Sequence, residues 1–567
     1  MIATYAAVLA VCAASLVLGQ AAITLCGGRR RSGVSPAVGL ALVCAICWAT
    51  VRMPGDGLIS AIVILILVGA STFYLYGRVE GGGETLRTGL PVALVALAAA
   101  SLPFIAEGHF GILGTGFNPD MSQHLLATDR IADGAGSQLL HQGYPLGPHA
   151  VVVALSKGLG IGLVQGFSGL TIAAAILAPL TALAAFADQP RLRGIAAALL
   201  VGLPYLVASY FAQGAFKETI QALFVLAFVL ALRASGRDWR DMPLRFVPAA
   251  LIAVGSVYVY SFPGLIWLAA ILALWLAFER SLPIRPLLLG LLVFLIGTLP
   301  ELGRMIDFHS FETFDPSGPG LGNLFGQVSP FTALGIWPSG DFRLAPGDGA
   351  VPAFAYFAGA AFAAILLLYG LAVDWRRRET TILAGVLAVV LLYVAARVGG
   401  TPYTSAKALE VAAPLLTLTI LVALVRRPVA LLYLVLAGAC SLLAFANAPV
   451  GPTTYSPALT GLRPLLAAGS TLVLAPDSLL ADEQGERYIV WELRGGRVCI
   501  EPESAAGGRP PTGIRFFVTE GAPSEPPFDR LALRRRAGPY LVWERRGAIG
   551  GPSPCPLIAV RQARQGP

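Results

Sequence analysis

Residues able to carry out acid–base chemistry gather in one polar stretch of an otherwise apolar chain. Between positions 104 and 149 lie four of the five histidines of the sequence, His109, His124, His141 and His149. Ionisable side chains are costly inside a bilayer, so membrane proteins concentrate them where they serve a function. This stretch is therefore predicted to contain the active site.

Asp120 is the candidate general base. It closes the sequence Asn118-Pro119-Asp120, a pattern typical of the first turn of a helix. In such a helix Asp120 and His124 share one face. The carboxylate could then take a proton from an incoming hydroxyl while the imidazole orients it. The alternative is that Asp120 only caps the helix. Asp129 is expected to face solvent or to pair with Arg130.

Lysine is rare in this chain and gives independent information. Among 40 basic residues only Lys157, Lys217 and Lys407 are lysines. Lys157 is predicted to be a membrane-edge residue. Lys217 and Lys407 fall at the predicted outer ends of spans, and compact ammonium groups suit phosphate oxygens. The alternative is that they extend to the interface or pair with Glu218 and Glu410.

A second polar loop covers residues 301–349 and contains the fifth histidine, His309. A loop of this length in a compact protein is usually functional or disordered. Its many aromatic residues predict order against the membrane, where it could close over a substrate. A divalent cation between the acidic and histidine residues of the two loops stays possible, although no recognised ligand spacing and no nucleotide-binding glycine motif occurs.

Composition predicts a membrane protein. The 567 residues are 56% hydrophobic and 13% charged, against about 25% charged in soluble proteins. Apolar runs of about 20 residues recur, each long enough to cross a bilayer. Residues 1–450 are therefore predicted to form an all-α polytopic helical bundle of about 13–15 spans. The net charge of +8 comes mostly from short basic clusters between spans, which indicate orientation and not nucleic-acid binding.

The basic clusters predict which loops face outward. The 106–143 loop, the 301–349 loop and the turn at Ser261–Gly264 become extracytoplasmic if residues 145–187 cross the membrane once. This requires Pro145–Gly160 to be an interfacial or re-entrant helix, followed by a span near residues 169–187. The protein is then a multi-pass protein of the cell membrane with its active-site loop outside.

Residues 451–567 are predicted to form a small extracytoplasmic α/β domain. Short apolar runs bounded by turn residues predict strands at Ser470–Ala475, Tyr488–Leu493 and Ile514–Thr519. Cys499 and Cys555 could form a disulfide on that side of the membrane. The other five cysteines, including Cys44 and Cys47, lie in or beside apolar runs and are expected in the core.

Several of these motifs together resemble the GT-C superfamily of integral-membrane glycosyltransferases. The resemblance rests on Asp120 in an early loop, the segment Tyr144-Pro-Leu-Gly-Pro-His149, the Phe-Lys-Glu around Lys217 and the Ala-Lys-Ala-Leu-Glu around Lys407. It departs from the usual pattern in having three spans before the acidic loop and no adjacent acidic pair.

The resemblance implies transfer of a sugar from a polyprenyl-phosphate donor to an extracytoplasmic glycan or lipid acceptor. Asp120 would be the base and His124 its partner. Substrate contacts would come from a further set of side chains: Tyr144, His149, Lys217, Glu218, Lys407 and His309. The alternative function is a transporter or flippase for lipid-linked sugars, which would place ionisable residues at mid-bilayer on broken helices.

Overall fold

The structure is a computed structural model of the whole chain. It describes residues 1–28, 30–80, 82–115, 117–118, 120–132, 143–279, 283–309, 320–451, 457–475, 489, 491–494, 496–521 and 525–555. His141 of the first polar loop and residues 310–319 of the second lie outside these ranges.

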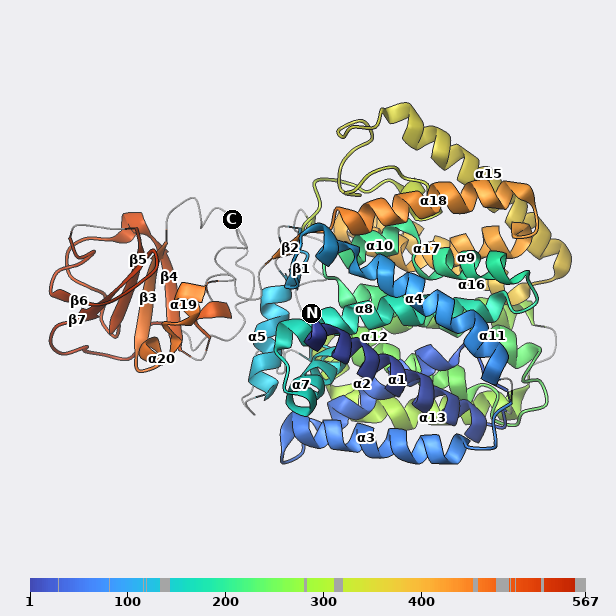
Figure 1. Cartoon of the computed structure of the whole chain (residues 1–567), viewed down its shortest axis with the longest axis horizontal. Coiled ribbons are helices and arrows are strands. Elements are labelled where there is room, and N and C mark those ends of the chain that lie inside the picture. The colour runs from blue at the N-terminus through green and yellow to red at the C-terminus, as the bar shows by residue number, and fades with distance from the viewer. Residues whose placement is uncertain are drawn as a thin grey trace.

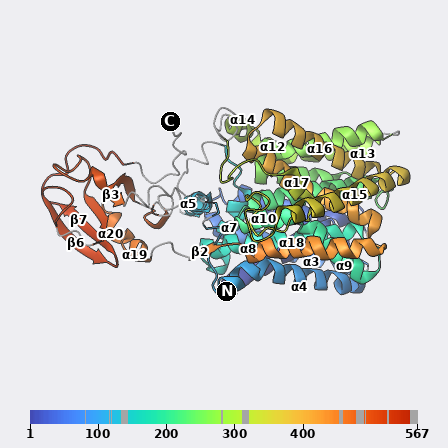
Figure 2. The same ribbon diagram turned by 90° about the horizontal axis from the view of Figure 1, so that it is seen from above.

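Helices dominate the first 450 residues, and most lie side by side along one direction (Figures 1 and 2). In chain order they are α1 (Ile2–Leu25), α2 (Ser35–Thr50), α3 (Asp56–Leu75), α4 (Gly82–Ala106), α5 (Asp120–Ala132), α7 (Gly147–Leu159), α8 (Leu163–Ala182), α9 (Arg191–Gly202), α10 (Tyr205–Ala212), α11 (Phe216–Gly236), α12 (Val247–Phe278), α13 (Ile284–Thr298), α14 (Leu302–His309), α15 (Ala353–Arg377), α16 (Thr380–Gly399), α17 (Pro402–Leu424) and α18 (Pro428–Ala446).

Eleven of the described helices are long and apolar enough to cross a membrane. Their apolar composition removes any need for an amphipathic pattern, since lipid and protein core are both apolar. Close helix contacts depend instead on small residues. At Gly19 of α1 and Gly39 of α2 an added Cβ would collide with the backbone of the facing helix. The predicted polytopic bundle is confirmed.

Helix α12 reverses direction inside its own length. Ser261 has φ 58° and ψ −155°, which interrupts the helix just before Pro263. The rings of Phe246 and Trp275 lie 5.7 Å apart, whereas a straight helix would separate them by roughly 43 Å at 1.5 Å per residue. The two legs are therefore antiparallel, and the turn predicted at Ser261–Gly264 is confirmed. The described residues thus contain eleven candidate spans, or twelve if the bent pair α9–α10 crosses as one; the predicted count of about 13–15 also included shorter apolar helices such as the 16-residue α2.

Basic residues meet at one end of the bundle. Arg233 and Arg237, at the end of α11, bind Glu379 between α15 and α16 at 3.1 and 2.7 Å. Arg193 at the start of α9 donates to the carbonyl of Arg426 at 2.8 Å. These contacts join loops that the sequence assigned to the same side of the membrane.

The opposite end carries the polar loops. Strand β1 (Ile112–Leu113), just after α4, pairs antiparallel with β2 (Val450–Gly451), just after α18. In Figure 1, β1, β2 and α5 lie together at this end. The 106–143 loop and the exit of the last helix therefore share one face of the bundle.

Helix α7 agrees with a segment that does not cross. It has only 13 residues, about 20 Å at 1.5 Å per residue, and it does not qualify as a span, whereas Leu163–Ala185 does. The span predicted near residues 169–187 thus begins six residues earlier. The reason is that the apolar run continues back to Leu163 once the turn at Gly160, with φ 65°, has ended α7.

The C-terminal region contains a five-stranded sheet with the order β4-β3-β5-β7-β6. Its strands are β3 (Ser470–Ala475), β4 (Arg497–Pro502), β5 (Phe516–Glu520), β6 (Leu531–Ala537) and β7 (Tyr540–Arg545). The sheet is mixed, since β3 runs parallel to β4 and β5 while β7 is antiparallel to β5 and β6. It lies beyond the end of the bundle that carries α5 (Figures 1 and 2).

The predicted disulfide and one predicted strand of this region can be compared with the structure. Cys499 and Cys555 form the expected disulfide. The strand predicted at Tyr488–Leu493 is wrong, because Ile489 and Trp491 are helical. Both side chains are buried, and a short apolar run of this kind does not by itself distinguish a buried helical turn from a strand.

Candidate functional site

Asp120 begins helix α5, as its sequence context predicted. The Asn118 side-chain oxygen accepts a hydrogen bond from the Asp120 backbone N–H at 3.0 Å, which caps the first turn. The Asp120 side chain is half-buried. A carboxylate in the first turn is stabilised by the positive end of the helix dipole.

His124 lies one turn further along α5 and is buried beside a second histidine. Its Nδ1 is 3.1 Å from Nε2 of His149 on α7, so one ring donates and the other accepts. Phe167 and Phe216 pack against both rings, the latter 4.9 Å from His124. Burial lowers the pKa of both imidazoles, that of His149 to about 3. This neutral pair joins α5 to α7.

Lys217, the second residue of α11, lies against Tyr144. Its ammonium donates to the Tyr144 hydroxyl and lies 4.0 Å from the centre of that ring. It also interacts electrostatically with the Asp120 carboxylate and with Lys407. Tyr144 itself is held by Arg304, which donates to the Tyr144 carbonyl at 2.6 Å.

Lys407 forms the second cationic group, on α17. Its ammonium is 2.9 Å from the Glu218 carboxylate, and the side chains are 18% and 7% exposed. Tyr260 donates to the same Glu218 oxygen at 3.2 Å, and Lys407 lies 4.2 Å from the Tyr403 ring centre. Of the two alternatives left open for Lys407, pairing with a nearby acid is what the structure shows.

The reversal of α12 places Tyr260 in this network. Gln221 of α11 spans the turn: it accepts from Ser256 at 2.8 Å and donates to the Gly264 carbonyl at 3.1 Å. The conformation of Ser261 is one that glycine adopts far more readily than other residues. Such strain persists only where surrounding contacts impose it, and it is common at functional sites.

Glu410 is a buried acid one turn beyond Lys407. Its side chain is 0% exposed, and neither oxygen has a hydrogen-bond partner among the described residues. It interacts electrostatically with Glu218 and Lys407. The carboxylate that binds Lys407 is thus Glu218, and Glu410 lies deeper in the bundle.

The remaining predicted residues occupy other positions. His309 is exposed at the end of α14, with its ring 5.9 Å from that of Phe262. Asp129 was expected to face solvent or pair with Arg130, and this is wrong: it pairs with Arg494 of the C-terminal region at 3.1 Å. Local spacing cannot reveal a partner 365 positions away.

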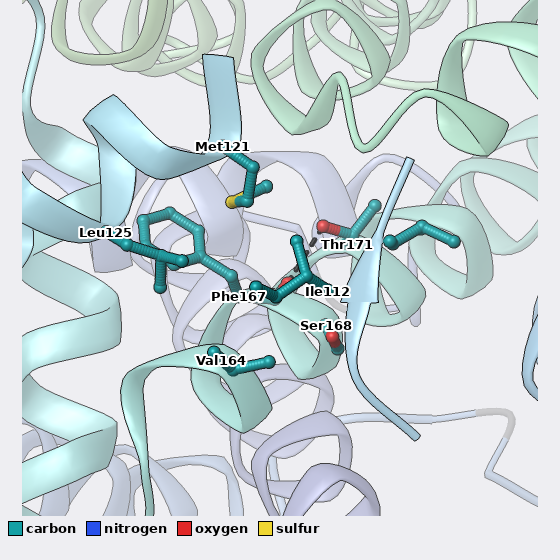
Figure 3. A pocket seen from close by; sticks show the side chains of 8 residues that line it. Ile112, Met121, Leu125, Val164, Phe167, Ser168 and Thr171 are labelled. Carbon is teal, nitrogen blue, oxygen red and sulfur yellow. Dashed lines mark hydrogen bonds between the residues drawn. The ribbon is translucent and has the colours of Figure 1, made fainter. Parts of the chain in front are cut away.

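A small cavity lies directly under α5 (Figure 3). Its volume is about 10 Å³, between α5, β1 and α8, and its lining is mostly apolar: Ile112, Leu113, Met121, Leu125, Val164, Phe167, Ser168 and Thr171. Ligand pockets usually measure about 300–1,000 Å³. This cavity is a packing gap behind the helix and not a substrate pocket.

The site therefore combines the carboxylates of Asp120 and Glu218 with two lysine ammonium groups. Asp120 on α5, Lys217 on α11 and Lys407 on α17 come from segments far apart in sequence and meet at one end of the bundle. Among the described residues no group of three or more histidine, cysteine or acidic side chains is arranged to hold a metal ion. Sequence analysis missed Tyr260 and Tyr403, whose signals were the turn at Ser261–Gly264 and the Thr-Pro-Tyr before Lys407.

Comparison with known proteins shows which solved structures have a similar fold. No family model and no curated protein sequence matches the chain. Solved structures do: the arabinofuranosyltransferase AftD from Mycobacteria aligns with a TM-score of 0.55 at 15% identity, over 82% of this chain and 40% of that one. Its R1389S mutant aligns with a TM-score of 0.52 at 14% identity, over 83% of this chain and 42% of that one. ArnT from Cupriavidus metallidurans aligns with a TM-score of 0.47 at 15% identity, over 83% of this chain and 100% of that one.

The chain spans about two fifths of the length of the AftD structures it matches. At this level of identity the likeness concerns fold. The fold expected from the GT-C resemblance agrees with this likeness, and the protein has a fold similar to that of the AftD structure.

Proposed function

We propose that this protein is a membrane glycosyltransferase that moves a sugar from a polyprenyl-phosphate donor to an extracytoplasmic glycan or lipid acceptor. The observation that carries the proposal is the grouping of Asp120 with Lys217 and Lys407 at one end of a GT-C fold. AftD is an arabinofuranosyltransferase, and the similarity of fold supports glycosyl transfer as the reaction class.

In the proposed reaction Asp120 accepts the proton of an acceptor hydroxyl. The oxygen attacks the anomeric carbon, a new C–O bond forms, and the bond from that carbon to the lipid phosphate breaks. Lys217 and Lys407 stabilise the charge that develops on the departing phosphate. The Lys407 ammonium is bound to Glu218 and has three N–H donors, so it can bind a phosphate oxygen while it keeps that partner.

The proposed orientation places this end outside the cell membrane. Basic clusters meet at the opposite end of the bundle, as expected for a cytoplasmic face. The Cys499–Cys555 disulfide fits an oxidising compartment. Residues 451–567 are accordingly proposed to be an extracytoplasmic domain.

The flippase alternative predicts ionisable groups at mid-bilayer on broken helices. The reversal in α12 and the buried Glu410 are compatible with that function. Lys217 and Lys407, however, are the second and sixth residues of their helices. This position near helix ends favours chemistry at the membrane surface.

The test supplies purified protein with a panel of polyprenyl-phosphate sugars and measures release of the lipid phosphate. Asp120→Asn should lower turnover at least about 100-fold, the usual contribution of a general base. Glu107→Gln, which changes an exposed acid at the same end, is the control and should match wild type. Unchanged turnover in Asp120→Asn would rule out Asp120 as the base, and translocation without phosphate release would favour the flippase.

A further inference from the structure

One extramembrane segment, Gly320–Arg343, touches all three chain segments that carry the charges of the site. We call it the clamp segment. The loop that contains it was expected to close over a substrate. The contacts instead involve backbone and side chains next to Asp120, Lys217 and Lys407.

The first contact is with Phe117, three residues before Asp120. The Phe117 carbonyl accepts two hydrogen bonds, from Arg343 Nη1 at 3.1 Å and from Asn323 Nδ2 at 2.9 Å. The Arg343 guanidinium also lies 4.3 Å from the Phe117 ring centre. The chain entering α5 is therefore fixed in both position and direction.

The second contact reaches the turn before Lys217. Asn323 Nδ2 donates to Gln213 Oε1 at 2.6 Å, in the turn between α10 and α11. One amide group thus bridges the segment that leads to Asp120 and the segment that leads to Lys217.

The third contact reaches the start of α17. The Tyr403 backbone N–H donates to the Gly320 carbonyl at 3.0 Å. Gly322, with φ 57°, lies so close to the Tyr403 ring that an added Cβ would come within 2.7 Å of it. Tyr403 is the residue whose ring lies against Lys407.

Arg343 is itself immobilised, so it is not a free cation for a substrate phosphate. Asp341 binds its guanidinium at 2.7 Å through Nη2 and at 2.9 Å through Nε. The Asn323 carbonyl accepts from it at 3.3 Å, and Phe325 covers it at 4.6 Å. The Arg343 side chain is only 7% exposed.

We propose that Arg343 and Asn323 are positioning residues that hold Asp120 at a fixed separation from Lys217. Catalytic groups must be kept within about 0.5 Å of their productive geometry by supporting contacts. A displacement of about 1 Å can lower turnover by about 100-fold. The inference rests on the proposed function for its catalytic consequence, but the clamp itself can be measured without any substrate.

The experiment uses full-length protein in lipid nanodiscs with the variants Arg343→Gln, Arg343→Lys and Asn323→Ala. Hydrogen exchange is followed at His124–Thr128, whose amides bond within α5. We expect exchange there to become at least about tenfold faster in all three variants. Lysine should not restore protection, because it lacks the fork that binds Asp341 and Phe117 together. Arg509→Gln, an exposed arginine of the C-terminal region, is the control.

Turnover per folded molecule is then compared on the lipid-phosphate release assay. We expect kcat to fall by about 10- to 100-fold while KM for the donor changes much less. Exchange rates that match wild type in both Arg343→Gln and Asn323→Ala would overturn the proposal. So would faster exchange with unchanged kcat. Faster exchange in a protein that transfers no sugar from any donor would leave the clamp intact and reject the proposed function.

Discussion

Replacing Lys407 by methionine should separate the structural role of this lysine from its chemical role. The ammonium lies 2.9 Å from the Glu218 carboxylate, and the two side chains are 18% and 7% exposed. Methionine keeps the length of the side chain but leaves Glu218 buried with a weaker set of partners, chiefly the Tyr260 hydroxyl at 3.2 Å.

The expected loss follows from burial. Removing one partner of a buried ion pair costs about 3–5 kcal/mol. Lys407 keeps some exposure, and Lys217 also interacts with Glu218, so we expect the lower end, about 3 kcal/mol. The double variant Lys407→Met/Glu218→Gln removes the stranded charge as well. It should recover about 2 kcal/mol, within the coupling usual for contacting residues.

The assay is the free energy of unfolding in mixed detergent micelles, measured for both single variants and the double variant. Lys157→Met is the matched control, since Lys157 is exposed at the end of α7; it should change stability by less than about 0.5 kcal/mol. A double variant as unstable as Lys407→Met would refute the reasoning.

Turnover tests the chemical role of Lys407. If Lys407 stabilises the departing phosphate, the double variant should regain stability without regaining activity. Wild-type turnover in the double variant would remove Lys407 from the proposed chemistry and leave it a structural residue.

Two further predictions concern pH and the disulfide. Burial lowers the pKa of His149 to about 3 and that of His124 well below its usual value, whereas the unfolded chain binds these protons near pH 6.5. The stabilisation that these two neutral imidazoles give should therefore be complete above about pH 6.5 and should be lost as pH drops toward 3. Thermal unfolding should show that the melting temperature of His124→Gln/His149→Gln falls less steeply with decreasing pH than that of wild type. An equally steep fall in both proteins would contradict a neutral histidine pair. The Cys499–Cys555 disulfide closes a loop of 56 residues, so Cys499→Ser/Cys555→Ser should destabilise the C-terminal sheet by about 4 kcal/mol; thiol labelling of seven free cysteines in the unreduced wild type would contradict the bond.

Much of the bundle could be predicted because the bilayer imposes a simple rule on sequence. A run of about 20 apolar residues is a span almost wherever it occurs, and short basic clusters order the spans. Even the reversal at Ser261 was visible, since Phe262-Pro263-Gly264 interrupts an apolar run with turn residues. Helix α5 was predicted from Asn118 and Pro119 for the same local reason.

The partners of the site residues could not be predicted in this way. Glu218 and Lys407 are separated by 189 positions and Asp129 and Arg494 by 365, and periodicity reports only neighbours within a few turns. Arg343 gave no signal of its own, because its role depends on a carbonyl 226 positions earlier. Strands β4, β6 and β7 were not predicted. Strand β6, for example, is largely exposed and rich in arginine, with little of the alternation that marks a half-buried strand.

The pairing of β1 with β2 has a consequence for how the protein is made. Leu113 leaves the ribosome more than 330 residues before Val450, its partner in the ladder. During that interval every span from α8 to α18 is synthesised and inserted, and the backbone groups of β1 lack their ladder partner. A nascent chain that stops before residue 449 also lacks the carbonyl that Gly114 binds. The backbone pairing of the early loop is thus completed only after the last helix of the bundle has been made.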